Sequence, residues 1–186
     1  MAPRRSSDDE ICGSDRVFLR QPRPADRERF IARMTASRKH LQPWIDPPTS
    51  VAAFYGHLKR NQDPRQLSTL IIRRSDDEII GVITLSEIVR GIFQSGYLGY
   101  YLTADAAGQG YMTEAMTALF GYTFRLLELH RLEANIQPDN ERSLALAQRL
   151  GLVKEGYSRR YLRIGGVWRD HERWAILAED WAERAG

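Results

Sequence analysis

The sequence predicts a single α/β domain of about seven strands and four helices. Its 186 residues fit one domain and suffice to bury a full hydrophobic core. Hydrophobic residues make up 42% of the chain and charged residues 27%, which is typical of a globular protein and unlike a disordered one. Apolar residues recur at every second position in some segments and at helical spacing in others, so strands and helices are both expected.

The first third of the chain is expected to hold a tail, one strand and two helices. Residues 1–15 are polar and show no period, which predicts a flexible tail ahead of a domain at 16–186. A strand follows at 17–20 and a helix at 25–39, in which three apolar residues share one face. A second helix begins near Val51, directly after a Thr-Ser pair that can cap it.

The middle third is expected to form three consecutive strands. The apolar runs at 70–72 and 79–85 flank a Ser-Asp-Asp-Glu turn, which is typical of a hairpin. A further strand at 97–102 contains Gly99, which indicates a bulge.

The last third alternates helix and strand and then ends in a hairpin. A long helix is expected at 113–129, a strand at 131–137 and a shorter helix at 140–150, which stops at a glycine. The strands at 157–164 and 167–177 are joined by Gly-Gly, which suits a two-residue turn.

Composition excludes several classes of protein. The 27 Lys and Arg residues exceed the 24 Asp and Glu by a small margin, too small for direct nucleic-acid binding without a clustered patch. Cys12 is the only cysteine, so an internal disulfide and a cysteine-based zinc cluster are excluded, and a reducing cytoplasm is expected. The four histidines lack a metal-ligand spacing, and we expect neither a signal peptide nor a membrane span.

The most informative segment lies between the strand at 97–102 and the long helix. Gly108 and Gly110 leave backbone N–H groups exposed beside a helix start, and together these can bind an anion such as a pyrophosphate. Thr113 stands where the dinucleotide-binding fingerprint has its third glycine, and the Walker sequence is absent. An ordinary glycine-rich turn is the alternative interpretation.

Several further segments occur in a specific order and spacing. They are Leu41-Gln42-Pro43-Trp44, Gly96-Tyr97-Leu98-Gly99-Tyr100, Gly108 to Ala115, Asn140-Glu141-Arg142-Ser143, and Tyr161 to His171. Together they resemble the GNAT superfamily of acyl-CoA-dependent N-acetyltransferases, and specifically its RimJ/RimL branch, which acetylates protein N-termini. The resemblance extends from Val17 to Trp181. It implies a mixed, mostly antiparallel sheet, splayed between its fourth and fifth strands, with helices on both faces.

The resemblance also implies where acetyl-CoA binds. The pyrophosphate is expected against the segment Ala107, Gly108, Gln109, Gly110, Tyr111, Met112 and Thr113. Two of these residues, Ala107 and Met112, depart from the family pattern. The strand edge at Tyr101, Leu102 and Thr103 is expected to pair with pantetheine. Asn140 is expected to contact CoA, and Arg149 either meets its 3′-phosphate or is a solvated helix residue.

The mechanism implied by the resemblance is direct acetyl transfer in a ternary complex. By this resemblance, Ser143 corresponds to the serine that looks like the general acid in RimL-like enzymes. The alternative is that Asn140 and Ser143 only cap a helix. Glu133 or Glu87 is the expected general base, and either carboxylate would order a water at the amine. The alternative is that each glutamate is a solvated or salt-bridged strand residue. The position of Cys12 in the expected tail disfavours a covalent relay.

The acceptor is expected to be a protein N-terminal α-amine, as in ribosomal proteins. Trp44, Glu87 and Asn135 are expected on its side of the site, and the alternative for Trp44 is a residue of the hydrophobic core. Arginines in the last hairpin form a basic rim that can steer an acidic peptide. The alternatives are a small-molecule amine, such as a polyamine or aminoglycoside, and a non-catalytic acyl-CoA-binding module. We expect a monomer or homodimer that binds no metal.

Overall fold

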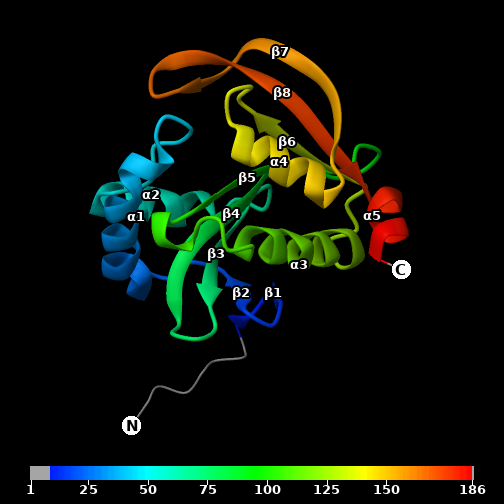
Figure 1. Ribbon diagram of the computed structural model, residues 1–186. Helices are drawn as coiled ribbons and strands as arrows, with labels where there is room; N and C mark the ends of the chain where they lie inside the picture. Colours follow the sequence, from blue (N-terminus) through cyan, green and yellow to red (C-terminus); the bar gives the residue numbers. More distant parts are fainter. Residues whose placement is uncertain (1–8, 186) are drawn as a thin grey trace.

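The computed structural model describes residues 9–185, in which the strands and helices follow the order predicted from the sequence, with β1 and α5 added at the ends (Figure 1). Their bounds are β1 (Cys12–Gly13), β2 (Val17–Arg20), α1 (Arg27–Leu41), α2 (Val51–Arg60), β3 (Leu67–Arg73), β4 (Glu78–Val89), β5 (Ser95–Leu102), α3 (Tyr111–Arg125), β6 (Arg131–Ile136), α4 (Glu141–Leu150), β7 (Val153–Ile164), β8 (Val167–Leu177) and α5 (Ala178–Ala185). Short 3-10 turns, η2 (Pro24–Asp26) and η3 (Ala104–Ala106), precede α1 and α3.

The strands form one mixed sheet in the order β1-β2-β3-β4-β5-β6-β8-β7. Neighbouring strands are antiparallel except β5 and β6, which run parallel. The expected α/β fold with a mostly antiparallel sheet is therefore confirmed, with eight strands among the described residues where about seven were expected.

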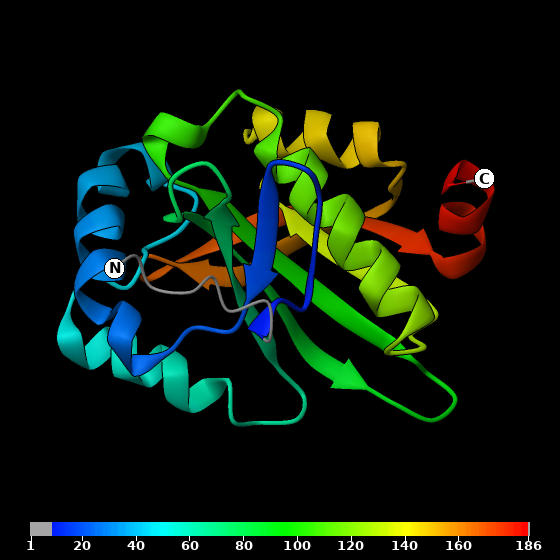
Figure 2. The same ribbon diagram turned by 90° about the horizontal axis from the view of Figure 1, so that it is seen from below.

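Helices cover both faces of this sheet, as expected (Figure 2). Phe30 and Met34 of α1 lie one helical turn apart, and they pack with Phe54 of α2 against Leu70 and Val82 on one face. The opposite face carries the larger core, in which α3 and α4 pack against the sheet. Both helix layers are thus held by apolar side chains that the helical period places on a single side.

The sheet splays between β5 and β6, the fourth and fifth strands of the sequence-based prediction. The two strands pair from Ser95 with Arg131 to Leu98 with Ala134. Beyond this point β6 continues to pair with β8, through Asn135 and Ile136, while the end of β5 stays with β4. A V-shaped opening follows, and it is the main feature that positions the functional site.

The two chain ends of the described structure differ from expectation. The expected tail reached residue 15, and its first eight residues lie outside the described part. Cys12 and Gly13 instead form β1, which pairs with Leu19 and Phe18 of β2. Burial raises the pKa of the Cys12 thiol to about 12, so the thiol stays protonated and is a poor nucleophile.

Helix α5 was not predicted from the sequence. It is short and mostly polar, and it joins the core through Ala178 and Trp181. The Trp181 ring packs on Phe124 of α3, with 5.7 Å between the ring centroids. One aromatic anchor on a distant helix therefore fixes this element, and such a contact leaves little periodic signal.

Candidate active site

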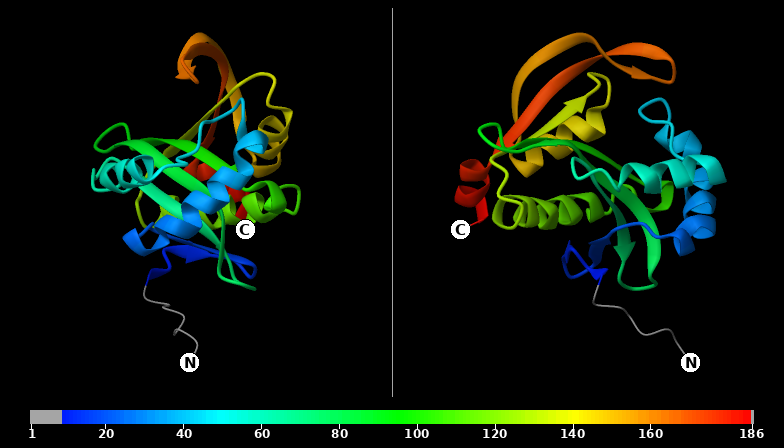
Figure 3. Two further views of the ribbon diagram at one scale, coloured as in Figure 1. Left: turned by 90° about the vertical axis from the view of Figure 1, so that its left-hand side faces the viewer. Right: turned by 180° about the vertical axis from the view of Figure 1, so that it is seen from behind.

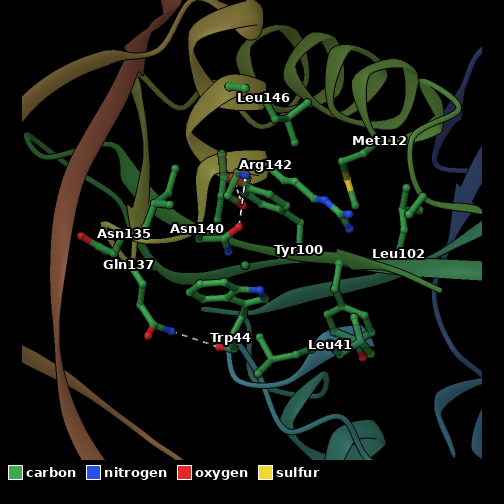
Figure 4. A pocket seen from close by; sticks show the side chains of 18 of the residues that line it. Leu41, Trp44, Tyr100, Leu102, Met112, Asn135, Gln137, Asn140, Arg142 and Leu146 are labelled. Carbon is green, nitrogen blue, oxygen red and sulfur yellow. Dashed lines mark hydrogen bonds between the residues drawn. The ribbon is translucent and has the colours of Figure 1, made fainter. Parts of the chain in front are cut away.

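A cleft of about 1120 Å³ opens where β5 and β6 diverge (Figure 4). Its walls come from the α1–α2 loop, the end of β5, the start of α3, the end of β6, α4 and the β7–β8 hairpin. The hairpin arches over the body of the molecule, and its turn reaches toward the α1–α2 loop (Figure 3). One end of the cleft therefore lies at the glycine-rich loop before α3, and the other lies under the hairpin.

The glycine-rich loop is shaped to receive an anion. Gly108 has φ +75° and Gly110, the N-cap of α3, has φ +83°, conformations that favour glycine. A Cβ at Gly108 would meet nothing within 4 Å, so the backbone there faces open space. The first N–H groups of α3 have no partner within the helix, and they add the positive end of its dipole.

Arg16, which immediately precedes β2, holds this loop in place through side-chain contacts. Arg16 donates to the Gln109 carbonyl at 3.0 Å, and its Nε donates to Glu114 Oε1 at 2.6 Å. The same guanidinium lies over the Tyr111 ring, 4.6 Å from the centroid. The Gln109 side chain folds back to donate to the Asp105 carbonyl at 2.6 Å. Gln109 and Tyr111 thus shape the loop, and they are not part of the cleft wall.

Of the other residues expected to bind CoA in this region, most line the cleft. They are Tyr101, Leu102, Ala107, Gly108, Gly110, Met112 and Thr113. Thr103 is buried and does not line it, because its N–H and hydroxyl both donate to the Ile80 carbonyl, at 2.8 and 3.2 Å. Thr103 therefore marks where β5 ends, and the open edge lies just before it.

The start of α4 places two predicted residues in the cleft. The Asn140 side chain accepts from the Ser143 N–H at 3.2 Å and so caps the helix. The Ser143 hydroxyl donates to Tyr100 Oη at 3.2 Å. Arg142 extends from the same turn into the cleft (Figure 4). Arg149 lines the cleft from the last turn of α4. Capping and cleft contact are thus compatible roles for this turn.

Trp44, Glu87 and Asn135, which were expected on the acceptor side, all line the cleft. The Trp44 carbonyl accepts from Gln137 Nε2 at 3.4 Å, which ties the α1–α2 loop to the end of β6. The side-chain oxygen of Asn135, Oδ1, is buried, and it has no hydrogen-bond partner among the described residues. Glu87 is exposed, with φ +47°, at an irregularity in the β4–β5 pairing.

Glu133 is not brought into the cleft wall with the others. Its carboxylate accepts from Arg131 Nε at 2.9 Å, and only 12% of its side chain is exposed. Arg131 is held in turn by Glu155, and both carboxylates raise the pKa of the guanidinium. The structure therefore gives Glu133 a fixed cationic partner on its own strand.

Sequence reasoning missed several cleft residues. They are His40, Tyr97, Tyr100, Arg142, Tyr161 and His171. Tyr100 contacts Ser143 of α4, and burial raises the pKa of its phenol. Most of these residues fall inside the segments that carry the family resemblance, which is the signal that could have found them.

A family model for the acetyltransferase (GNAT) domain matches residues 16–153. The chain belongs to the GNAT acetyltransferase family. The [ribosomal protein uS5]-alanine N-acetyltransferase of Escherichia coli is 37% identical over 179 residues, which cover 90% of this chain and 91% of that protein. The spermidine N(1)-acetyltransferase of Vibrio cholerae is 23% identical over 162 residues, which cover 84% of this chain and 91% of that protein.

Solved structures agree with this assignment. Mycobacterium smegmatis RimJ, solved in complex with CoA-disulfide, superposes on this GNAT acetyltransferase with a TM-score of 0.80 and 30% identity. The match covers 88% of this chain and 83% of that one. The expected likeness to the RimJ/RimL branch is therefore confirmed.

Neither a metal cluster nor a membrane span is found in the described residues. Within 9–185, no group of three or more His, Cys, Asp or Glu side chains is placed to hold a metal ion. None of the helices in that range is long and apolar enough to cross a bilayer.

Proposed function

We propose that this GNAT acetyltransferase transfers acetyl from acetyl-CoA to the α-amine of a protein N-terminus, by direct attack in a ternary complex. The observation that carries the proposal is the single cleft, which extends from the glycine-rich loop to an acceptor mouth under the hairpin. The identity of 37% to the uS5-alanine N-acetyltransferase supports the choice of acceptor. An acceptor of ribosomal-protein type and the unpaired thiol of Cys12 both suit a reducing cytoplasm.

The residues present fit CoA. Gly108 and Gly110 have positive φ, and the open space at Gly108 lets the backbone approach a pyrophosphate closely. The N–H groups at the start of α3 can then bind its oxygens. Arg142 and Arg149 supply cations within the cleft for phosphate oxygens. The free edge at Tyr101 and Leu102 offers backbone groups to an extended chain such as pantetheine. When bound in this cleft, acetyl-CoA would supply an activated thioester.

Ser143 is proposed as the general acid. Its hydroxyl lies 3.2 Å from Tyr100 Oη, and a hydroxyl can donate one proton while it accepts from another group. When Ser143 turns its proton toward a departing thiolate, Tyr100 can donate to the Ser143 oxygen. The buried Tyr100 thereby keeps the serine hydrogen-bonded in both orientations, which limits the cost of the rotation.

The charge of the acceptor mouth favours a peptide over a polyamine. The hairpin that covers the mouth carries five exposed arginines, which are Arg159, Arg160, Arg163, Arg169 and Arg173. Among the described residues that line the cleft, Glu87 is the only acidic one. A polyamine carries several positive charges and would be repelled by this rim, whereas a peptide with one α-amine and acidic side chains would be attracted.

An acetylation assay tests the proposal. Peptides with free N-termini, the same peptides with blocked N-termini, spermidine and an aminoglycoside are offered with acetyl-CoA, and the product is located by mass spectrometry. We expect acetylation of the free α-amine and little turnover of the blocked peptides or the polycations. Faster acetylation of spermidine would refute the proposed acceptor. Calorimetric binding of CoA without turnover of any amine would instead support a non-catalytic module.

A further inference from the structure

His171 lies in the part of the cleft that the β7–β8 hairpin covers. It sits on β8 opposite Ser158 of β7, two residues before Arg173, which pairs with Asn135 at the diverging end of β6. His171 lines the cleft, and only 2% of the residue is exposed. An acceptor amine or a water that entered the cleft would approach this side chain from the cleft side.

The backbone fixes which ring nitrogen of His171 carries the proton. Nδ1 lies 3.0 Å from the Arg169 carbonyl oxygen. A carbonyl oxygen can only accept a hydrogen bond, so Nδ1 is the donor. In a neutral imidazole the other nitrogen, Nε2, then keeps its lone pair. The ring is thus held as the tautomer that a general base requires.

Burial also keeps this imidazole neutral. Desolvation lowers the pKa of His171 below its usual 6.5, against the opposing effects of the Arg169 carbonyl and the Asp170 carboxylate. The Tyr161 ring from β7 packs edge-on, with 6.2 Å between the ring centroids. Two other charged neighbours on β8 are engaged elsewhere, since Arg173 lies against Gly156 and Glu172 binds Lys154. Asp170 accepts from the Tyr157 hydroxyl and the Arg160 N–H.

The other titratable groups near the acceptor are less suited to take a proton. The Glu133 carboxylate is bound to Arg131 and lies outside the cleft wall. Glu87 is exposed to solvent, where a carboxylate is a weak base for an amine. Burial and the nearby Glu133 charge raise the pKa of Tyr97, so its phenol stays protonated at neutral pH.

We propose that His171 is the general base of the reaction and that its Nε2 takes the proton of the attacking amine, directly or through one water. This inference rests on the proposed acetyl transfer and adds the group that completes it. The amine nitrogen forms a bond to the acetyl carbon as the carbon–sulfur bond breaks. One proton passes from the amine to Nε2, and one passes from Ser143 to the thiolate. The imidazolium then loses its proton to the solvent, and Ser143 regains one.

Kinetics of a His171→Gln variant test this assignment. Glutamine keeps a polar side chain of similar size but has no basic nitrogen. We expect kcat to fall about 100-fold or more, in the range usual for loss of a general base, with the KM for acetyl-CoA unchanged. In the wild-type enzyme kcat should fall at acidic pH with an apparent pKa below 6.5, and the variant should lack this decrease. Added imidazole should restore part of the activity of His171→Ala.

A matched control is available at His130, which is exposed and contacts Glu179 outside the cleft. His130→Gln should keep the wild-type kcat and the wild-type pH profile. Thermal melting and calorimetric titration with CoA show whether each variant is folded. If His171→Gln does not fold, His171→Asn and imidazole rescue of His171→Ala provide the same readout.

The outcomes separate this inference from the proposed function. If His171→Gln keeps kcat within about threefold or keeps the acidic decrease, His171 is not the base. If the decrease of kcat at acidic pH is lost in Glu133→Gln and kept in His171→Gln, Glu133 is the general base. The assays use whichever amine the wild-type enzyme accepts. A preference for polyamines therefore refutes the proposed acceptor and leaves the assignment of His171 as the base unaffected. An enzyme that acetylates no amine would overturn both.

Discussion

A substitution at Gly108 tests whether the glycine-rich loop binds the pyrophosphate. The residue has φ +75°, it lines the cleft, and a Cβ there would meet nothing within 4 Å. Gly108→Ala should therefore cost about 1 kcal/mol of unfolding free energy, the usual price of a left-handed conformation without glycine, and no clash should add to it. The new methyl group would occupy the space into which the anion is expected to settle.

The effect on CoA binding should be larger than the effect on stability. If the methyl group disrupts one hydrogen bond between the backbone and a phosphate, the loss is about 1.5 to 3 kcal/mol. This corresponds to a Kd for CoA that rises about 10- to 150-fold. Gly91 offers a matched control, because it has φ +72° and also has nothing within 4 Å, yet it lies in the β4–β5 turn.

Calorimetric titration with CoA and denaturant unfolding measure the two quantities. Gly91→Ala should lose the same stability as Gly108→Ala and bind CoA with the wild-type affinity. An unchanged Kd in Gly108→Ala, or an equal loss in both variants, would refute the assignment of this loop.

Three further predictions concern the acid, the fold and the rim. Ser143→Ala should lower kcat about 100-fold with CoA affinity kept, and an unchanged thiol-release rate would remove Ser143 from the mechanism. Burial lowers the pKa of His57 to about 4 from 6.5, and its Nε2 lies 3.0 Å from Ser68 Oγ. The unfolded chain thus binds more protons between these pH values, so stability should fall by up to about 3 kcal/mol from pH 6.5 to 4, and a flat denaturant midpoint would contradict this. Changing Arg160 and Arg163 to Glu should raise kcat/KM for spermidine at low salt roughly 10-fold, and no change would exclude steering by the rim.

Local signals in the sequence located most of the helices and turns. Ser50 accepts from the Ala53 N–H at 3.2 Å, and Asn140 and Gly151 cap the two ends of α4, all as predicted. Gly165 and Gly166 both take positive φ at the hairpin turn. These features depend on one or two residues and their immediate neighbours, so the chain alone specifies them.

The contents of the cleft were harder to predict because they depend on the order of strands in the sheet. Asn135 pairs with Arg173, 38 positions along the chain, and this pairing is what brings His171 to the acceptor side. Alternation along β6 placed Glu133 and Asn135 on one face, and it could not show that Arg131 would bind the Glu133 carboxylate. A strand pattern gives the side of the sheet on which a residue lies, and only the fold gives its partners.

The divergence of β5 and β6 has a consequence for the order of events in the reaction. Because the cleft extends from the glycine-rich loop to the hairpin, the nucleotide end of CoA and a bulky acceptor would occupy opposite ends of it. A large acceptor that occupies the hairpin side would leave the nucleotide side clear. We therefore expect spent CoA to exchange while a macromolecular partner is still engaged, so that neither product must wait for the other to depart.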